Sequence, residues 1–221
     1  MLIYENYVLV FLEKWKHRKS IAFGQGSICL AGAGIMELIL REKLMIEGKR
    51  LKIIDPNPIG VEFLDEILTL IKDSKKIRKL NKWIILISSG RSIDCETLVF
   101  KGLENQSIVK FEKRVFAKVF YNWKYDVTKP EVIQSLLQRI QNAFIDNIEP
   151  DIELLCLVSL SQISRLFKAC FSKEYRNIAK HRMEQLLRFG NYDPRHLEMI
   201  KNIKKAFKAA TRDGGIELLP L

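Results

Sequence analysis

The chain has 221 residues, of which 48% are hydrophobic, enough apolar material for one compact domain or two closely joined lobes. Its 37 Lys and Arg outnumber 26 Asp and Glu, and the resulting formal charge of +11 attracts phosphates, nucleic acid or an anionic bilayer. The longest apolar runs fall far below the ~18 residues that cross a bilayer, and Glu5 stands where a secretory signal carries cations. These features exclude a membrane-spanning or exported class and predict a cytoplasmic protein.

The first quarter of the chain predicts two helices and a hairpin. Apolar residues at helical spacing indicate a helix over residues 8–15 and another over residues 30–38. The second helix contains the small residues 31–34, which allow close backbone approach. They have no preceding strand and no following Lys-Ser or Lys-Thr, so they do not form a phosphate loop. Over residues 43–54, apolar and polar residues largely alternate on either side of a glycine turn, which is the pattern of a β-hairpin.

Two helices and a second hairpin are expected next. Apolar spacing predicts helices over residues 63–71 and 77–84, joined by a segment rich in cations. A short helix over residues 92–104 then leads into residues 108–127, whose Phe, Tyr and Trp content favours another hairpin.

The last third of the chain carries clear helix-start signals. Residues 128–131 have capping-box spacing with a proline in the first turn, so a helix should open at Thr128. Further helices are expected to begin near Pro150 and Glu174, and Asp193 has the position of an N-cap before a proline. The pattern predicts a mainly α fold: a compact helical core with two surface β-hairpins. We expect a single domain over residues 1–221, with a soft boundary between lobes near residues 146–150.

Several short sequence segments, called phrases below, follow one another in a characteristic order. They lie at residues 30–41, 58–61, 64–68, 83–84, 125–128 and 179–187. Taken in this order, from about Glu5 to Ala210, they resemble the Golgi phosphoprotein 3 family. The resemblance implies an almost entirely helical core with surface hairpins, in agreement with the residue patterns.

The function that the resemblance implies is that of a peripheral membrane adaptor. Eukaryotic members of the family recognise phosphatidylinositol 4-phosphate on Golgi membranes and hold glycosyltransferase tails there. The expected partners are therefore an anionic membrane lipid and the cytoplasmic tails of membrane proteins. The expected location is cytoplasmic, peripheral on a membrane, and at the Golgi if the host is eukaryotic.

The chain departs from the family at the headgroup site, which uses one tryptophan and three arginines. The corresponding residues are Ala22, Ala31, Ile93 and Glu96. Phe23 adjoins the tryptophan position, Arg91 could replace one lost arginine, and the amides after Ser92 would support an anion. Phe23, Arg91 and Ser92 are therefore the candidate headgroup residues. The departures resemble a divergent, prokaryotic-type member of the family, and they leave the lipid headgroup open.

A second candidate for membrane contact is the hairpin over residues 108–127. In its middle, apolar residues are flanked by cations, an arrangement that can enter the headgroup boundary while the cations meet lipid phosphates. The candidate residues are Lys113, Arg114, Val115, Phe116 and Lys118. The alternatives are contact with a second protomer, which would make a homo-oligomer, and ordinary packing on the core.

Two further basic surfaces are predicted, one between two helices and one along the last helix. They consist of Lys75, Lys76, Arg78, Lys79, Lys201, Lys204, Lys205 and Lys208. They could lie on phosphates or be only solvated faces. The alternative function is sequence-independent nucleic-acid binding by winged-helix-like units, since +11 also suits phosphate contacts along a duplex.

Catalysis and metal binding find no support in the residue pattern. Ser159, Ser161 and Ser164 have no histidine partner readable from the sequence, and no Gly-x-Ser-x-Gly elbow occurs. The four cysteines lie far apart, without metal-ligand or redox spacing, which predicts reduced core thiols. We therefore expect a non-enzymatic protein with neither metal nor cofactor.

Overall fold

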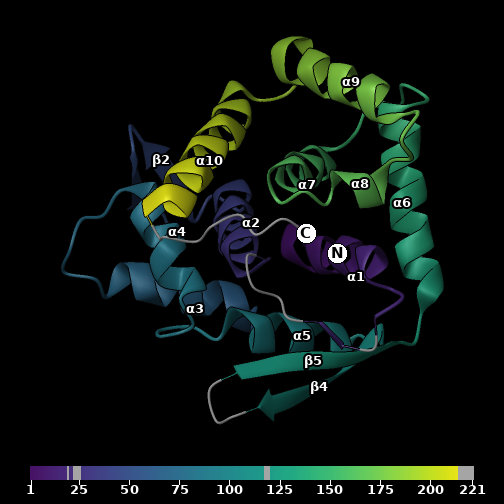
Figure 1. Ribbon diagram of the computed structural model, residues 1–221. Coiled ribbons are helices and arrows are strands. Elements are labelled where there is room, and N and C mark those ends of the chain that lie inside the picture. The colour runs from purple at the N-terminus through teal and green to yellow at the C-terminus, as the bar shows by residue number, and fades with distance from the viewer. Residues whose placement is uncertain (19, 22–25, 117–119, 214–221) are drawn as a thin grey trace. The chain divides into compact units, whose positions relative to one another are not determined.

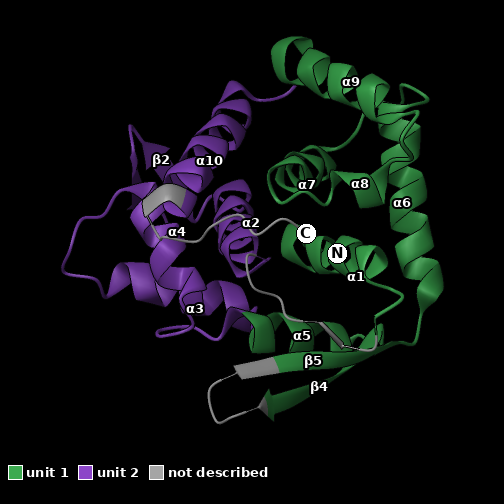
Figure 2. Cartoon of the chain, viewed as in Figure 1, with its two compact units in different colours: residues 1–24, 96–190 green, residues 25–95, 191–221 purple. Residues whose placement is uncertain are grey.

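The computed structural model describes residues 1–18, 20–21, 26–116 and 120–213 (Figure 1). This part of the chain is mainly helical and carries small antiparallel sheets, which confirms the predicted fold class. It divides into two compact units (Figure 2). Unit 1 comprises residues 1–24 and 96–190, and unit 2 comprises residues 25–95 and 191–221. Residues 146–150 lie inside unit 1, and the single-domain assignment stays a prediction.

Unit 1 is built on two helices, α1 (Ile3–Lys14) and α7 (Ile152–Ile163), that are buried on almost every side. Its other elements are β1 (Ser20–Ile21), α5 (Cys95–Asn105), β4 (Val109–Phe116), β5 (Phe120–Val127), α6 (Pro130–Phe144), α8 (Phe167–Cys170) and α9 (Arg176–Phe189). The helix α1 packs against α6, α7 and α8. Its near-continuous apolar run explains this enclosure, because a helix that is apolar all round has no face for water.

The predicted second hairpin is confirmed as β4 and β5, with Val109 opposite Val127 and Phe116 opposite Phe120. The short strand β1 adds to the free edge of β5, so the sheet has the order β1-β5-β4. Two residues in the middle of β5 thus find main-chain partners far away in the sequence. The pattern of residues did not predict β1.

Unit 2 surrounds one apolar helix, α2 (Gly26–Leu40). Around it lie β2 (Leu44–Glu47), β3 (Arg50–Ile53), α3 (Glu62–Lys72), α4 (Leu80–Ser88) and α10 (Pro194–Asp213). The helix α2 contacts α3, α4, α10 and β2, and α10 also packs on α4. The first predicted hairpin is confirmed as β2 and β3, which turn at Gly48 with a positive φ of 63°.

The predicted helix starts agree with the structure only in part: α1 begins at Ile3 rather than at residue 8, and the starts predicted for α4, α5 and α6 also differ. Asp193 caps α10, since its carboxylate accepts the backbone N–H of Arg195 at 2.8 Å. The predicted capping box at Thr128 is wrong. The backbone N–H of Thr128 still bonds Ile108 at 3.0 Å, continuing the hairpin, and its hydroxyl donates to the Ser107 carbonyl at 2.9 Å. The helix α4 likewise begins only at Leu80, and Ile77 is 79% exposed.

The four cysteines are free thiols, and all of them are buried, as predicted for core positions. Burial raises the pKa of the Cys170 thiol to about 12. No helix of the described residues is long and apolar enough to cross a membrane.

Close packing between α2 and α3 depends on Gly34. A Cβ atom at this position would lie 2.6 Å from the Ile67 Cδ1 atom and 3.0 Å from the Phe63 ring. Both of these side chains are buried, so neither has free space into which it could move. The predicted packing role of the small residues is confirmed at Gly34.

We therefore expect Gly34→Val to lower the free energy of unfolding by about 1–3 kcal/mol, because the added methyl groups overpack this contact. Chemical unfolding followed by circular dichroism measures the change. Leu40→Val is the control, since it places the same β-branched residue at a half-buried position of the same helix, and should cost below about 1 kcal/mol. Equal losses in both variants would refute the close contact.

Candidate functional site

Where the structure describes them, the residues at the family's headgroup positions are buried: Ala31 and Ile93 belong to unit 2, and Glu96 belongs to unit 1. Arg91 and Ser92 are exposed, but α5 begins at Cys95, three residues beyond the predicted start at Ser92. Ile93 is 3% exposed and Glu96 is 6% exposed. Phe23 lies outside the described residues. Of the three candidate headgroup residues, Arg91 and Ser92 thus lie at the surface, beside positions occupied by core residues.

Glu96 holds the hairpin rather than facing an anion. Its Oε2 atom accepts a hydrogen bond of 2.8 Å from the indole nitrogen of Trp123, and both side chains are buried. Around this bond, the Phe100 ring stacks on Phe111 with centroids 4.0 Å apart and meets Trp123 edge-on at 4.6 Å. The half of the hairpin nearest α5 therefore packs on the core.

The side chains of β4 from Glu112 to Val115 are exposed. Directly paired residues of an antiparallel sheet share a face and successive side chains alternate, so Val115 lies on the same face as Trp123. Val115 is 63% exposed. Lys113 lies 5.3 Å from the Trp123 ring, and Arg114 forms an ion pair of 3.4 Å with Glu112.

Part of the predicted contact motif cannot be placed. Lys118 and the side chain of Phe116 lie outside the described residues.

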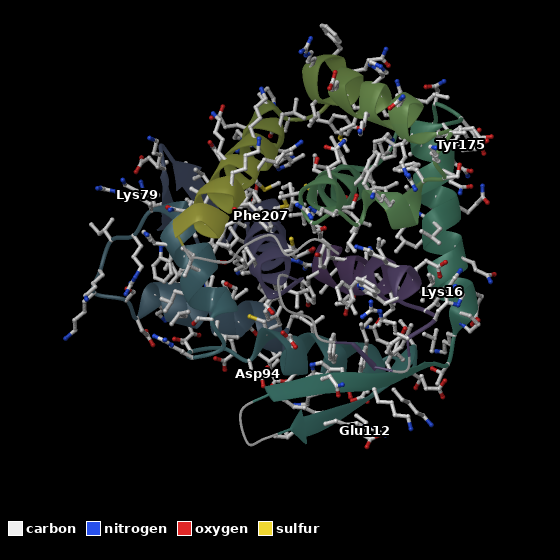
Figure 3. The ribbon with its side chains drawn as sticks, viewed as in Figure 1. Lys16, Lys79, Asp94, Glu112, Tyr175 and Phe207 are labelled. Carbon is white, nitrogen blue, oxygen red and sulfur yellow. The ribbon has the colours of Figure 1, made fainter. Side chains whose placement is uncertain are left out.

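The cationic loop between α3 and α4 contains one structural residue and several surface residues. Arg78 is half-buried, donates to the Ser74 hydroxyl, and places its guanidinium 4.9 Å from the Trp83 ring. Lys75, Lys76 and Lys79 are exposed. Lys79 directly precedes α4 (Figure 3). Arg78 thus packs against its own loop, whereas the three lysines are available to a ligand.

The helix α10 separates an apolar face from a cationic one. Ile200, Ile203 and Phe207 are at most 4% exposed, in agreement with the packing of α10 on α2 and α4. The cationic side consists of Lys201, Lys205 and Lys208, which are exposed, and Lys204, which is half-buried.

The two basic segments of unit 2 meet at one cavity of about 510 Å³. It is lined by the β2–β3 turn at Gly48 and Lys49, by Lys79, Leu80 and Asn81 at the start of α4, and by Asn202, Lys205, Ala206 and Ala209 of α10. Lys79 and Lys205, which lie far apart in the sequence, thus border the same space. We call this space the lysine cavity.

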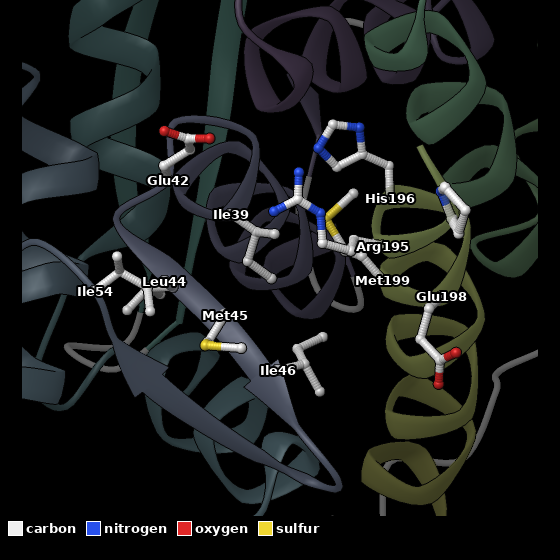
Figure 4. Close-up of a pocket in the computed structure, with 11 residues that line it drawn as sticks. Ile39, Glu42, Leu44, Met45, Ile46, Ile54, Arg195, His196, Glu198 and Met199 are labelled. Atoms are coloured by element: carbon white, nitrogen blue, oxygen red, sulfur yellow. The ribbon is translucent and has the colours of Figure 1, made fainter. Parts of the chain in front are cut away.

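A second cavity of unit 2, of about 530 Å³, has mainly apolar walls (Figure 4). Side chains from α2, β2 and α10 line it, among them Ile39, Met45 and Met199. Arg195 also lines this cavity, and its hydrogen bonds to Asp193 lower the pKa of that carboxyl to about 2. Because the guanidinium of Arg195 is already paired with Asp193, this cavity offers an apolar surface rather than an anion site.

Unit 1 carries a basic cluster that the residue pattern did not reveal. Two cations lie over the Trp15 ring, Lys14 at 4.8 Å and Arg18 at 4.2 Å from its centroid. Burial, and then the charges of Lys168, Arg165 and Arg18, lower the pKa of Lys14. Arg165 and Lys168 follow α7 in the sequence, far from Lys14 and Arg18. Tertiary packing therefore assembles the cluster, and no local spacing of residues predicts it.

The family model of Golgi phosphoprotein 3 (GPP34) matches residues 3–206, nearly the whole chain. The chain belongs to this family. Membership in the Golgi phosphoprotein 3 family agrees with the resemblance drawn from the ordered phrases of the sequence. Within the described residues, no group of three or more His, Cys, Asp or Glu is placed to hold a metal ion.

This family member should depend on the Glu96 hydrogen bond for stability. We expect Trp123→Phe to lower the free energy of unfolding by about 1–3 kcal/mol, because it removes a buried donor from a carboxylate. Glu96→Gln retains an acceptor for the indole and should cost less. Urea unfolding followed by far-ultraviolet circular dichroism measures both variants. A Trp123→Phe variant as stable as the wild type would contradict the assigned role of Glu96.

Proposed function

We propose that the protein is a peripheral membrane protein that binds anionic lipid headgroups on the cytoplasmic face and acts there as an adaptor or scaffold. The observation that supports this proposal is the convergence of two lysine-rich segments of unit 2 at one surface. Membership in the Golgi phosphoprotein 3 family supplies the adaptor role. Cytoplasmic tails of membrane proteins are the partners proposed for it. We propose no catalytic role.

The cationic surface of unit 2 favours docking over insertion. The apolar face of α10 is occupied by packing on α2 and α4, so this helix cannot also enter the bilayer as a free amphipathic helix. What remains for the membrane is an array of exposed lysines, each contributing about 1 kcal/mol near an anionic surface. Binding of this kind weakens with added salt.

The first test reverses charge on this surface outside the lysine cavity. Lys76→Glu, Lys201→Glu and Lys208→Glu, combined, should weaken sedimentation with phosphatidylserine vesicles at least tenfold, since three favourable contacts become repulsive. The control combines Lys173→Glu, Lys180→Glu and Arg188→Glu, exposed residues of unit 1 that change the net charge equally. It should change binding less than twofold.

Equal losses in the two triple variants would show that only the net charge matters and would overturn the assigned surface. Steep salt-dependent binding to duplex DNA, with no binding to vesicles, would favour the nucleic-acid alternative instead.

The β4–β5 hairpin is proposed as a second membrane contact. Phe116→Asp combined with Lys118→Glu should weaken vesicle binding about tenfold, because it removes an apolar contact and reverses one charge. Sedimentation of the free protein is measured in parallel. A fall in its mass, with vesicle binding unchanged, would assign the hairpin to contact between protomers, and no change in either measurement would leave ordinary packing as its role.

A further inference from the structure

The lysine cavity combines three cations from three separate elements of unit 2. Lys49 lies in the β2–β3 turn, Lys79 directly before α4, and Lys205 on the exposed side of α10. All three side chains are exposed, so solvent and ligands can reach them. None of the residues that line the cavity is acidic. The cavity therefore presents positive charge from several directions, as a bound anion requires.

The walls of the cavity are held by main-chain bonds and core packing. The backbone N–H of Leu80 donates to the Lys49 carbonyl at 2.8 Å, and the backbones of Arg50 and Lys79 form an isolated antiparallel β-bridge. The turn is therefore tied to the start of α4. The buried side chains of Leu80, 3% exposed, and Ala206, 9% exposed, form the base. The three lysines thus project from fixed backbone positions.

The charges around the cavity are uncompensated within the described part of the chain. No ion pair joins Lys49, Lys79 or Lys205 to a carboxylate there. The neighbouring Glu47 instead lies 4.0 Å from Lys52. The α4 helix also begins here, and its N-terminal end adds partial positive charge. An anion placed between the three ammonium groups would replace their mutual repulsion by attraction.

We propose that the lysine cavity is a binding site for a phosphate group carried on a hydroxyl-bearing head. The lysines would hold the phosphate as point charges, and the amides of Asn81 and Asn202 can donate to and accept from hydroxyl groups. Its volume of about 510 Å³ lies within the range of ~300–1,000 Å³ typical of small-molecule sites. The site shares no residue with the family's headgroup positions. As a lipid site it rests on the proposed membrane function, whereas a soluble phosphorylated compound would need no membrane.

The binding test uses a soluble probe, inositol 1,4-bisphosphate, with inorganic phosphate as the minimal ligand. Calorimetry of the full chain should show saturable 1:1 binding. Lys79→Gln combined with Lys205→Gln should weaken binding at least tenfold. The matched control, Lys76→Gln combined with Lys208→Gln, removes the same charge from exposed lysines that do not line the cavity, and should change it less than twofold.

A second variant fills the cavity without changing any charge. Ala209 is half-buried and lines the wall formed by α10, so Ala209→Leu would occupy part of the space. We expect at least a tenfold loss of probe binding from this substitution. Lys49→Gln changes an exposed side chain of the turn and should also weaken binding. Thermal melts verify that all variants are folded. Equal losses in the pocket and control pairs, or full binding by a folded Ala209→Leu variant, would overturn the site.

Vesicles distinguish the two sources of the phosphate. Phosphatidylinositol 4-phosphate vesicles should retain the wild type more strongly than phosphatidylserine vesicles of equal net charge. Ala209→Leu, which changes no charge, should lose only this preference. Vesicle binding without preference and without probe binding would refute the cavity while leaving the membrane function in place. Probe binding without vesicle binding would support the cavity, assign it to a soluble phosphorylated compound, and refute the membrane function.

Discussion

The enclosure of α2 is the constraint on which the architecture of unit 2 depends. This helix is buried from Ile28 to Leu38, including Glu37, which is held by an ion pair of 3.1 Å with Arg41. Because none of its sides tolerates water, other elements have to cover it, and α3, α4, α10 and β2 pack on it. Each covering element turns its apolar face inward, which leaves its cations outward. The surface charge of unit 2 is thus a consequence of how its core is closed.

The same closure determines which basic residues meet. The packing of α10 on α4 brings Lys205 to the start of α4. The backbone β-bridge between Arg50 and Lys79 brings the β2–β3 turn to the same place. Not every cation of these segments becomes part of the surface. Arg78, directly beside Lys79, instead packs on Trp83, since a planar guanidinium stacks on an aromatic ring.

Much of the fold was accessible from the sequence, because amphipathic periodicity reports directly on which face of a helix or strand is buried. Both hairpins and most helices follow from it. Errors arose where a long-range bond overrides a local signal, as when Thr128 continues the hairpin by bonding Ile108. The candidate site was accessible only in part. Lys79 and Lys205 stood out in charged runs, but Lys49 is a single lysine in a turn, and only tertiary packing reveals its proximity to them.

The Glu96 position explains why the anion recognition that we propose for this chain uses residues other than those at the family's headgroup positions. Glu96 is buried and bonds the Trp123 indole, so an arginine there would place a cation in the core and remove the acceptor from a buried donor. Ile93 is buried as well, and a cation at that position would be desolvated in the same way. Recovering the family's arginines would therefore require the hairpin to detach from α5. A cationic cavity formed by exposed lysines meets no such obstacle, because its charges remain hydrated until a ligand arrives.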